Sequence, residues 1–182
     1  MATPRLRLQG ILPVLWSRAR QYAKEDPIRI FNCAESMANM YLIYRNWEWF
    51  KARGLAERAL LTAWSNQQWT FPSGPMMCWC MCMSDRAELL RWSDPFPEGD
   101  TYTLYRGIGG NGNPHGFSWT TDLDIAKRFA NRMHGLGTIY KTKVRREDVY
   151  ARIHESGRGE HEMLLMLHAS TRLEVVSASE AA

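Results

Sequence analysis

The length, composition and charge of the chain limit what it can be. Its 182 residues suffice for one substantial core, or for a helical segment packed on a small catalytic domain. With 45% hydrophobic and 23% charged residues, its composition is typical of a soluble globular protein. The net charge of +4 permits an acidic partner but is too mild to indicate nucleic-acid binding by itself.

Neither a membrane span nor a disulfide framework is indicated. No apolar run approaches the roughly 20 residues that cross a bilayer, and residues 1–20 lack the long apolar core of a secretory signal. Three of the four cysteines are crowded at Cys78, Cys80 and Cys82, which is a poor arrangement for structural disulfides. We therefore expect a cytoplasmic protein with reduced thiols and no membrane partner.

Residues 1–95 are predicted to form a helical segment. A first pattern ends at Gly54, a residue type that commonly stops helices. The apolar positions at helical spacing in this pattern are Met37, Met40, Tyr41, Tyr44 and Trp47. A second helix is marked by Leu55, Ala59, Leu60, Ala63 and Trp64. A third is predicted after "FPSGP" and reaches about Trp92, before the prolines of "SDPFPEGD" break the pattern.

Residues 96–182 alternate short strands with turns. The predicted strands lie in "TYTLYRG", "GFSWTT", "GTIYKTKV", "DVYARI", "EMLLMLH" and "TRLEVVS". One helix lies in "TTDLDIAKRFANRM", where Thr121 and Asp124 match the spacing of a capping box. Its expected apolar face is Ile125, Ala126, Phe129, Ala130 and Met133. Helices followed by a mostly β domain with one embedded helix predict an α+β fold.

The glycine-rich stretch "GIGGNG", residues 107–112, satisfies the pattern G-x-G-x-x-G. A dinucleotide-binding fingerprint requires a helix to open at once, whereas Asn113, Pro114 and another strand follow here. A loop between strands is therefore the favoured interpretation.

No metal site is expected. "PMMCWCMCMSD" offers soft ligands, but on a helix only Cys78 and Cys82 share a face and no histidine is near. Core packing is the better interpretation for these residues. The five histidines show no metal spacing, although His154 and His161 could line a pocket.

Two carboxylates stand directly before an apolar run in "RGEHEMLL", residues 158–165. In a strand, residues i and i+2 point the same way, so Glu160 and Glu162 are expected to share a face. Two like charges at a partly buried site need cationic or hydroxyl partners. A solvated strand end is the alternative on this segment alone.

An arginine and a group of hydroxyls could supply those partners. Arg106 shares a strand face with Leu104, so its guanidinium is expected to be buried and to need an anion, either a glutamate or a ligand phosphate. Hydroxyls at Ser118, Thr120 and Thr121 stand where a strand meets a helix N-terminus. Thr121 is expected to cap that helix, which leaves the other two to point into a site.

The order of these elements carries a family resemblance. Arg106 in "YRG", hydroxyls in "GFSWTT" before "AKRFA", and "EHEMLL" before "TRLEVVS" together resemble the mono-ADP-ribosyltransferases of the arginine-serine-glutamate class. The likeness is strongest to the small forms encoded by bacteria and their phages, and it covers about residues 101–178. It implies a split β-sandwich of two small antiparallel sheets that enclose a cleft for NAD, the substrate.

The resemblance also implies roles for individual residues. Arg106 would hold an NAD phosphate, with Gly107 beside it. Glu162 would be the catalytic acid that bonds the ribose 2′-hydroxyl, and Glu160 would orient or deprotonate the acceptor, as in enzymes that modify arginine. The loop from Glu155 to Gly159 would meet the target.

The hydroxyl motif departs from the family pattern, which is usually Ser-Thr-Ser. This chain has Ser118-Trp119-Thr120-Thr121, and Ser118 is our choice for the hydroxyl that holds the glutamate, with Thr120 as the alternative. Trp119 would either flank the NAD site or point into the core.

The function implied is transfer of ADP-ribose from NAD to a macromolecule, most plausibly a protein arginine, with release of nicotinamide. An NAD glycohydrolase, in which water is the acceptor, is the enzymatic alternative. A catalytically inactive binding module with the same fold is the alternative from another class. A nucleic-acid acceptor is a minority option, because no basic-aromatic platform for single strands is evident.

Overall fold

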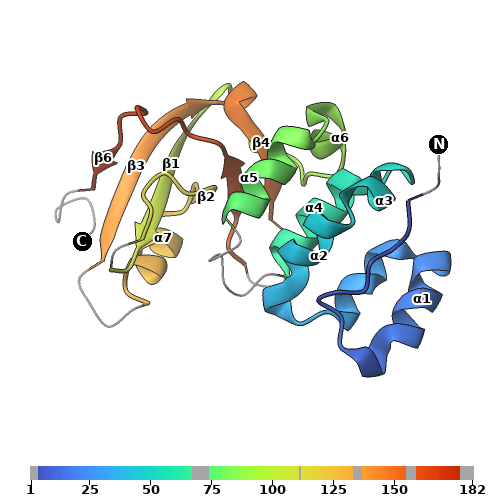
Figure 1. The fold of residues 1–182 in the computed structure, drawn as a ribbon. Coiled ribbons are helices and arrows are strands. Elements are labelled where there is room, and N and C mark those ends of the chain that lie inside the picture. Colours follow the sequence, from blue (N-terminus) through green and yellow to red (C-terminus); the bar gives the residue numbers. More distant parts are fainter. Residues whose placement is uncertain (1–3, 67–73, 111, 133–136, 155–158, 177–182) are drawn as a thin grey trace. The chain divides into compact units, whose positions relative to one another are not determined.

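The computed structural model describes residues 4–66, 74–110, 112–132, 137–154 and 159–176 (Figure 1). The chain divides into two compact units, Met1–Trp92 and Ser93–Ala182. The first unit is helical and the second is built on a sheet, so the fold is α+β. Within the described ranges, no helix is both long enough and apolar enough to cross a membrane.

The first unit consists of short helices. Its α-helices are α1 (Trp16–Glu25), α2 (Asn39–Arg45), α3 (Trp47–Lys51), α4 (Ala56–Ser65), α5 (Gly74–Met83) and α6 (Arg86–Arg91). Its 3-10 helices are η1 (Pro13–Leu15), η2 (Pro27–Cys33) and η3 (Ser36–Ala38). Helix α4 contacts α2, α3, α6 and η2 and is central to the core of this unit.

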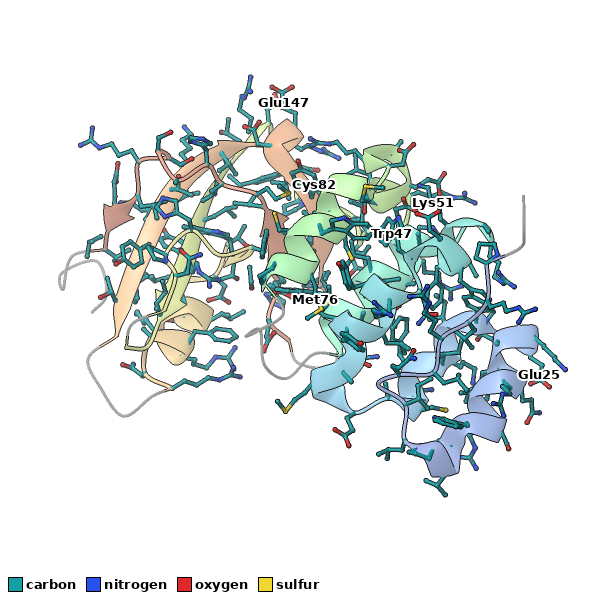
Figure 2. All side chains as sticks on the ribbon, viewed as in Figure 1. Glu25, Trp47, Lys51, Met76, Cys82 and Glu147 are labelled. Carbon is teal, nitrogen blue, oxygen red and sulfur yellow. The ribbon has the colours of Figure 1, made fainter. Side chains whose placement is uncertain are left out.

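The core of the first unit is rich in aromatic side chains. The rings of Phe31 and Phe50 stack with their centroids 5.7 Å apart, and Trp49 meets Phe50 edge-on at 4.9 Å. The apolar face predicted for α4 is confirmed at Ala59, Leu60, Ala63 and Trp64, which are all buried, whereas Leu55 is partly buried and precedes the helix. Lys51, labelled in Figure 2, is the last residue of α3 and forms a 2.7 Å salt bridge with the buried Glu57.

The long helix predicted to end at Gly54 is interrupted. Helices α2 and α3 are separated at Asn46, whose side chain accepts a hydrogen bond from the Arg7 amide (2.6 Å) and donates one to the Leu42 carbonyl (2.9 Å). The predicted apolar face is also partly wrong, since Met37, Tyr41 and Tyr44 are exposed. The stop signal itself is confirmed: Gly54 has φ +65° just beyond α3.

The third predicted helix is likewise divided, into α5 and α6. The break falls at Asp85, which caps α6 by accepting hydrogen bonds from the amides of Ala87 and Glu88. The Asp85 amide in turn donates to the Glu57 carboxylate at 3.0 Å, so a contact with α4 fixes the break.

The second unit contains the six predicted strands, and they form one sheet within the described residues. They are β1 (Thr101–Ile108), β2 (Ser118–Thr120), β3 (Thr138–Arg145), β4 (Val149–Ile153), β5 (Glu162–Leu165) and β6 (Glu174–Val175). Every pairing is antiparallel, in the order β4-β5-β2-β1-β3-β6. The two separate small sheets expected from the sequence are therefore not confirmed.

The neighbouring strands of the sheet pair over very different lengths. Strands β1 and β3 pair along their whole length, from Thr101↔Arg145 to Ile108↔Thr138. Strands β1 and β2 pair at Tyr105↔Thr120 alone. This single pair, called the β1–β2 junction below, joins the three strands β4, β5 and β2 to the three strands β1, β3 and β6.

The two faces of the sheet are covered differently. One face carries the core cluster of Tyr102, Leu104, Trp119, Val144, Val149, Met163 and Leu165. Helix α7 (Leu123–Ala130) packs on β1 from the face of Gly107, which lies opposite by strand alternation (Figure 1). A Cβ atom on Gly107 would stand 1.8 Å from the Ala126 carbonyl oxygen, so the glycine permits this close approach. The 3-10 helix η4 (Arg146–Asp148) joins β3 to β4.

The cap of α7 is one residue later than predicted. Asp122 caps it, and its carboxylate accepts hydrogen bonds from the amides of Asp124 (2.8 Å) and Ile125 (3.2 Å). Thr121 is exposed and does not cap the helix. The apolar face of α7 is confirmed at Ile125, Ala126 and Ala130, which are buried, whereas Met133 lies outside the described residues.

Candidate active site

Three neighbouring strands bring together the arginine, the hydroxyls and the glutamate singled out in the sequence. Arg106 stands near the end of β1, Thr120 ends β2, and Glu162 begins β5. Strand β2 lies between the other two, and the register runs from Tyr105 through Thr120 to Glu162. Residues that are far apart in the sequence are thus adjacent in the sheet.

Glu162 is a buried carboxylate with a hydroxyl directly across the ladder. Only 4% of the residue is exposed, and its cross-strand partner on β2 is Thr120, itself 5% exposed. Directly opposed side chains have Cβ atoms about 5 Å apart. The Thr120 hydroxyl accepts a hydrogen bond from the Asp122 amide (3.1 Å), so it can still donate its own proton. Ser118 pairs with Leu164 instead and lies one step further along the same face.

Arg106 braces the β1–β2 junction through backbone carbonyls. Its Nε donates to the Asn113 carbonyl at 3.2 Å, and its Nη1 donates to the Ser118 carbonyl at 2.6 Å. The guanidinium lies against Gly116, where a Cβ atom would be 2.3 Å from Nη2. These bonds tie β1 to the segment before β2 and to β2 itself, where the strand ladder provides one pair only.

Arg106 and Glu162 also interact electrostatically. Strand alternation alone would direct them to opposite faces, because Tyr105, not Arg106, is aligned with Thr120 and Glu162. Burial lowers the pKa of the Arg106 guanidinium to about 10, and the charge of Glu162 acts to raise it. The guanidinium is therefore protonated at neutral pH, and a glutamate supplies the negative charge that the sequence led us to expect near it.

Glu160 is buried as well, but it does not belong to the strand. Strand β5 begins at Glu162, and His161 has φ +46°, a left-handed backbone that is uncommon outside glycine. The alternation from which we expected Glu160 and Glu162 to share a face therefore stops between them. Glu160 is 9% exposed, and its Oε1 lies 3.8 Å from Nη2 of Arg132.

One histidine, His161, lies between the two glutamates in the sequence and meets a second histidine, His154. The rings of His154, after β4, and His161 lie 4.3 Å apart between centroids and are tilted by 37°. The His154 amide donates to the Asp94 carboxylate at 2.6 Å. Its ring Nδ1 is buried and makes no hydrogen bond to any part of the chain that the structure describes.

Trp119 and Gly107, which the resemblance assigns to NAD, both have structural roles in the sheet. Trp119 is 1% exposed within the core cluster, and its Nε1 donates to the Gly116 carbonyl at 2.8 Å. It takes the core position that was one of the two possibilities for it. Gly107 is explained by the close packing of α7 on β1. Of the loop expected to meet the target, positions 155–158 lie outside the described residues.

The remaining motifs take no part in this site. Stretch 107–112 begins with the last two residues of β1 and is followed by β2. Among the described residues, no helix stands where a dinucleotide fingerprint requires one. No group of three or more potential metal ligands occurs in the described ranges. Cys33, Cys78, Cys80 and Cys82 are free thiols.

Two residues near this site were not found from the sequence. Gly116 carries no distinctive sequence signal, because a glycine near a strand is ordinary, and only the packing of Arg106 against it reveals its importance. Arg132 carries none either, because its contact with Glu160 joins distant segments. Comparisons of the chain with protein-family models, with curated proteins and with solved structures gave no match.

Proposed function

We propose that the chain is an NAD-dependent mono-ADP-ribosyltransferase that modifies arginine side chains. The observation that carries the proposal is the buried Glu162 carboxylate, which is opposed by the Thr120 hydroxyl and interacts electrostatically with Arg106. A carboxylate, a hydroxyl and a guanidinium are the three groups that the resemblance requires at one place.

Release of nicotinamide from NAD requires a negative charge that is held in a fixed position. Cleavage of the nicotinamide–ribose bond passes through an oxocarbenium-like transition state, and the electron pair of the C1′–N bond leaves with nicotinamide. A preorganised carboxylate stabilises the positive charge that develops on the ribose. Glu162 is preorganised in this sense because it begins a strand that is buried at every position.

The surrounding residues take supporting roles. Thr120, rather than Ser118, is the better hydroxyl to hold Glu162, because it is the direct cross-strand partner. Glu160 would accept a proton from the acceptor guanidinium, whose nitrogen forms the new bond to C1′. Arg106 would brace the strands and provide positive charge for an NAD phosphate; its bonds to the Asn113 and Ser118 carbonyls support the bracing part directly.

The strand pairing is compatible with the split β-sandwich that the resemblance implies. The single pair of the β1–β2 junction divides the strand order into two groups of three, with the candidate residues on either side of the division. A split between two small sheets would fall at this junction.

The purified chain incubated with labelled NAD and a cell lysate tests the proposal. We expect release of nicotinamide together with label on protein. Label recovered only as free ADP-ribose would identify a glycohydrolase instead, and no release of nicotinamide would exclude both activities.

A matched pair of variants links the activity to the site. Glu162→Gln should lower the rate of nicotinamide release by about 10² to 10³-fold, because it removes the charge and keeps the shape. Glu174→Gln is the control, since Glu174 stands on the exposed strand β6 and forms a surface salt bridge with Lys141. Equal loss of activity in both variants would contradict the assignment.

A further inference from the structure

An arginine of the chain itself stands beside the carboxylate assigned to the acceptor. Arg132 follows α7, and its Nη2 lies 3.8 Å from Oε1 of Glu160. The two partners differ sharply in exposure, because the Arg132 side chain is 63% exposed and the Glu160 side chain only 11%. Other salt bridges described in this unit, such as Lys127–Asp124 and Lys141–Glu174, use carboxylates that are 85% and 63% exposed.

The Arg132 guanidinium lies near Glu160, but the contact between them is weak. A pair with one solvent-exposed partner at this distance contributes at most about 1 kcal/mol. The guanidinium carbon also lies 4.4 Å from the Phe129 ring centroid, within the range of a cation–π contact. Exposure leaves the guanidinium nitrogens accessible to a second molecule, while the two contacts keep them close to the carboxylate.

We propose that Arg132 is a site of self-modification, and that it accepts ADP-ribose from NAD bound by its own chain. The inference rests on the proposed function and deepens it by naming an acceptor. An Nη atom of Arg132 would form a bond to C1′ of the ribose while the C1′–N bond to nicotinamide breaks. Nicotinamide leaves with that electron pair, and Glu160 takes the proton that the guanidinium loses. No oxidant or reductant is required.

The short distance predicts a reaction within one chain. An acceptor held beside Glu160, the carboxylate assigned to deprotonate it, has a high effective concentration at the site, so it competes well with acceptors in solution. The rate of modification per chain should then be independent of protein concentration. Modification between chains would rise with concentration.

Peptide mapping by mass spectrometry after incubation of the purified chain with NAD tests the inference. We expect ADP-ribose on Arg132. The variant Arg132→Lys should carry at least about tenfold less adduct, since it loses the guanidinium that is held next to Glu160. Arg128→Lys is the matched control, because Arg128 is an exposed arginine of α7, and it should retain the adduct on Arg132.

The outcomes separate this inference from the proposed function. Nicotinamide release with no adduct on Arg132 would overturn the inference alone, whereas no nicotinamide release would overturn both. A mixture of wild-type chain with a size-tagged Glu162→Gln chain tests the reaction within one chain. The tagged chain should stay unmodified at Arg132, and its modification to the level of the wild-type chain would contradict a reaction in cis.

Discussion

Thr120 and Glu162 face each other across the ladder that joins β2 to β5, and both side chains are almost fully buried. The pairing of the two strands holds these residues opposite each other. The neighbouring hydroxyl, Ser118, is aligned with Leu164 instead.

This register predicts different effects for two hydroxyl deletions. Thr120→Val should lower kcat for nicotinamide release about 10 to 100-fold, because it removes the hydroxyl that we propose holds the Glu162 carboxylate. A hydrogen bond to a charged group is worth about 1.5 to 3 kcal/mol. Ser118→Ala should cost less than about threefold, since the Ser118 carbonyl that Arg106 binds is kept. Steady-state kinetics with NAD would measure both. A larger loss for Ser118→Ala would assign the motif hydroxyl to Ser118.

Gly116 should be intolerant of a methyl group. A Cβ atom there would stand 2.3 Å from Nη2 and 2.6 Å from Cζ of Arg106, so the guanidinium would have to leave its position. We expect Gly116→Ala to lower the unfolding free energy by about 1 to 3 kcal/mol in a urea titration. Gly74→Ala is the control, because no atom lies within 4 Å of its Cβ position. Equal stability of the two variants would show that Arg106 does not need this glycine.

The left-handed backbone of His161 can be tested without its ring. His161→Gly and His161→Ala both remove the ring contact with His154, but glycine adopts φ +46° at no steric cost. We expect the glycine variant to be more stable than the alanine variant by about 1 kcal/mol, measured by chemical denaturation. A more stable alanine variant would mean that residue 161 leaves the left-handed region once the ring is gone.

The cysteines of α5 should differ in reactivity. Burial raises the pKa of Cys80 to about 12, whereas Cys82, labelled in Figure 2, is exposed. The thiolate is the reactive form, so at pH 8 only about one Cys80 in ten thousand is ionised in the folded protein. Alkylation followed by mass spectrometry should label Cys82 first and Cys80 only after denaturation. Labelling of both at one rate would contradict the burial of Cys80.

The strands of the second unit could be predicted because their signals are local. Alternating apolar residues bounded by glycine, proline and aspartate define a strand within a few residues, and all six predicted strands occur. The breaks in the helical unit could not be predicted in this way. Asn46 separates α2 from α3 through bonds to Arg7, and Asp85 separates α5 from α6 through a bond to Glu57, and both contacts join segments distant in the sequence.

The same difference between local signals and contacts of distant segments applies to the candidate site. The sequence indicated Arg106, Ser118 or Thr120, Glu160 and Glu162 as residue types suited to the chemistry, and the sheet order brings together the strands of all but Glu160. It could not predict the choice between Thr120 and Ser118, which depends on a register of one pair. Nor could it predict the left-handed backbone of His161, because residues other than glycine adopt it uncommonly and nothing in "EHE" marks it.

The sheet order has a consequence for the synthesis of the protein. Strand β5 lies between β2 and β4, although it follows both in the chain. A nascent chain that has left the ribosome only as far as residue 161 lacks the strand that connects β4 to the rest of the sheet. It also lacks Glu162, the carboxylate on which the proposed function depends.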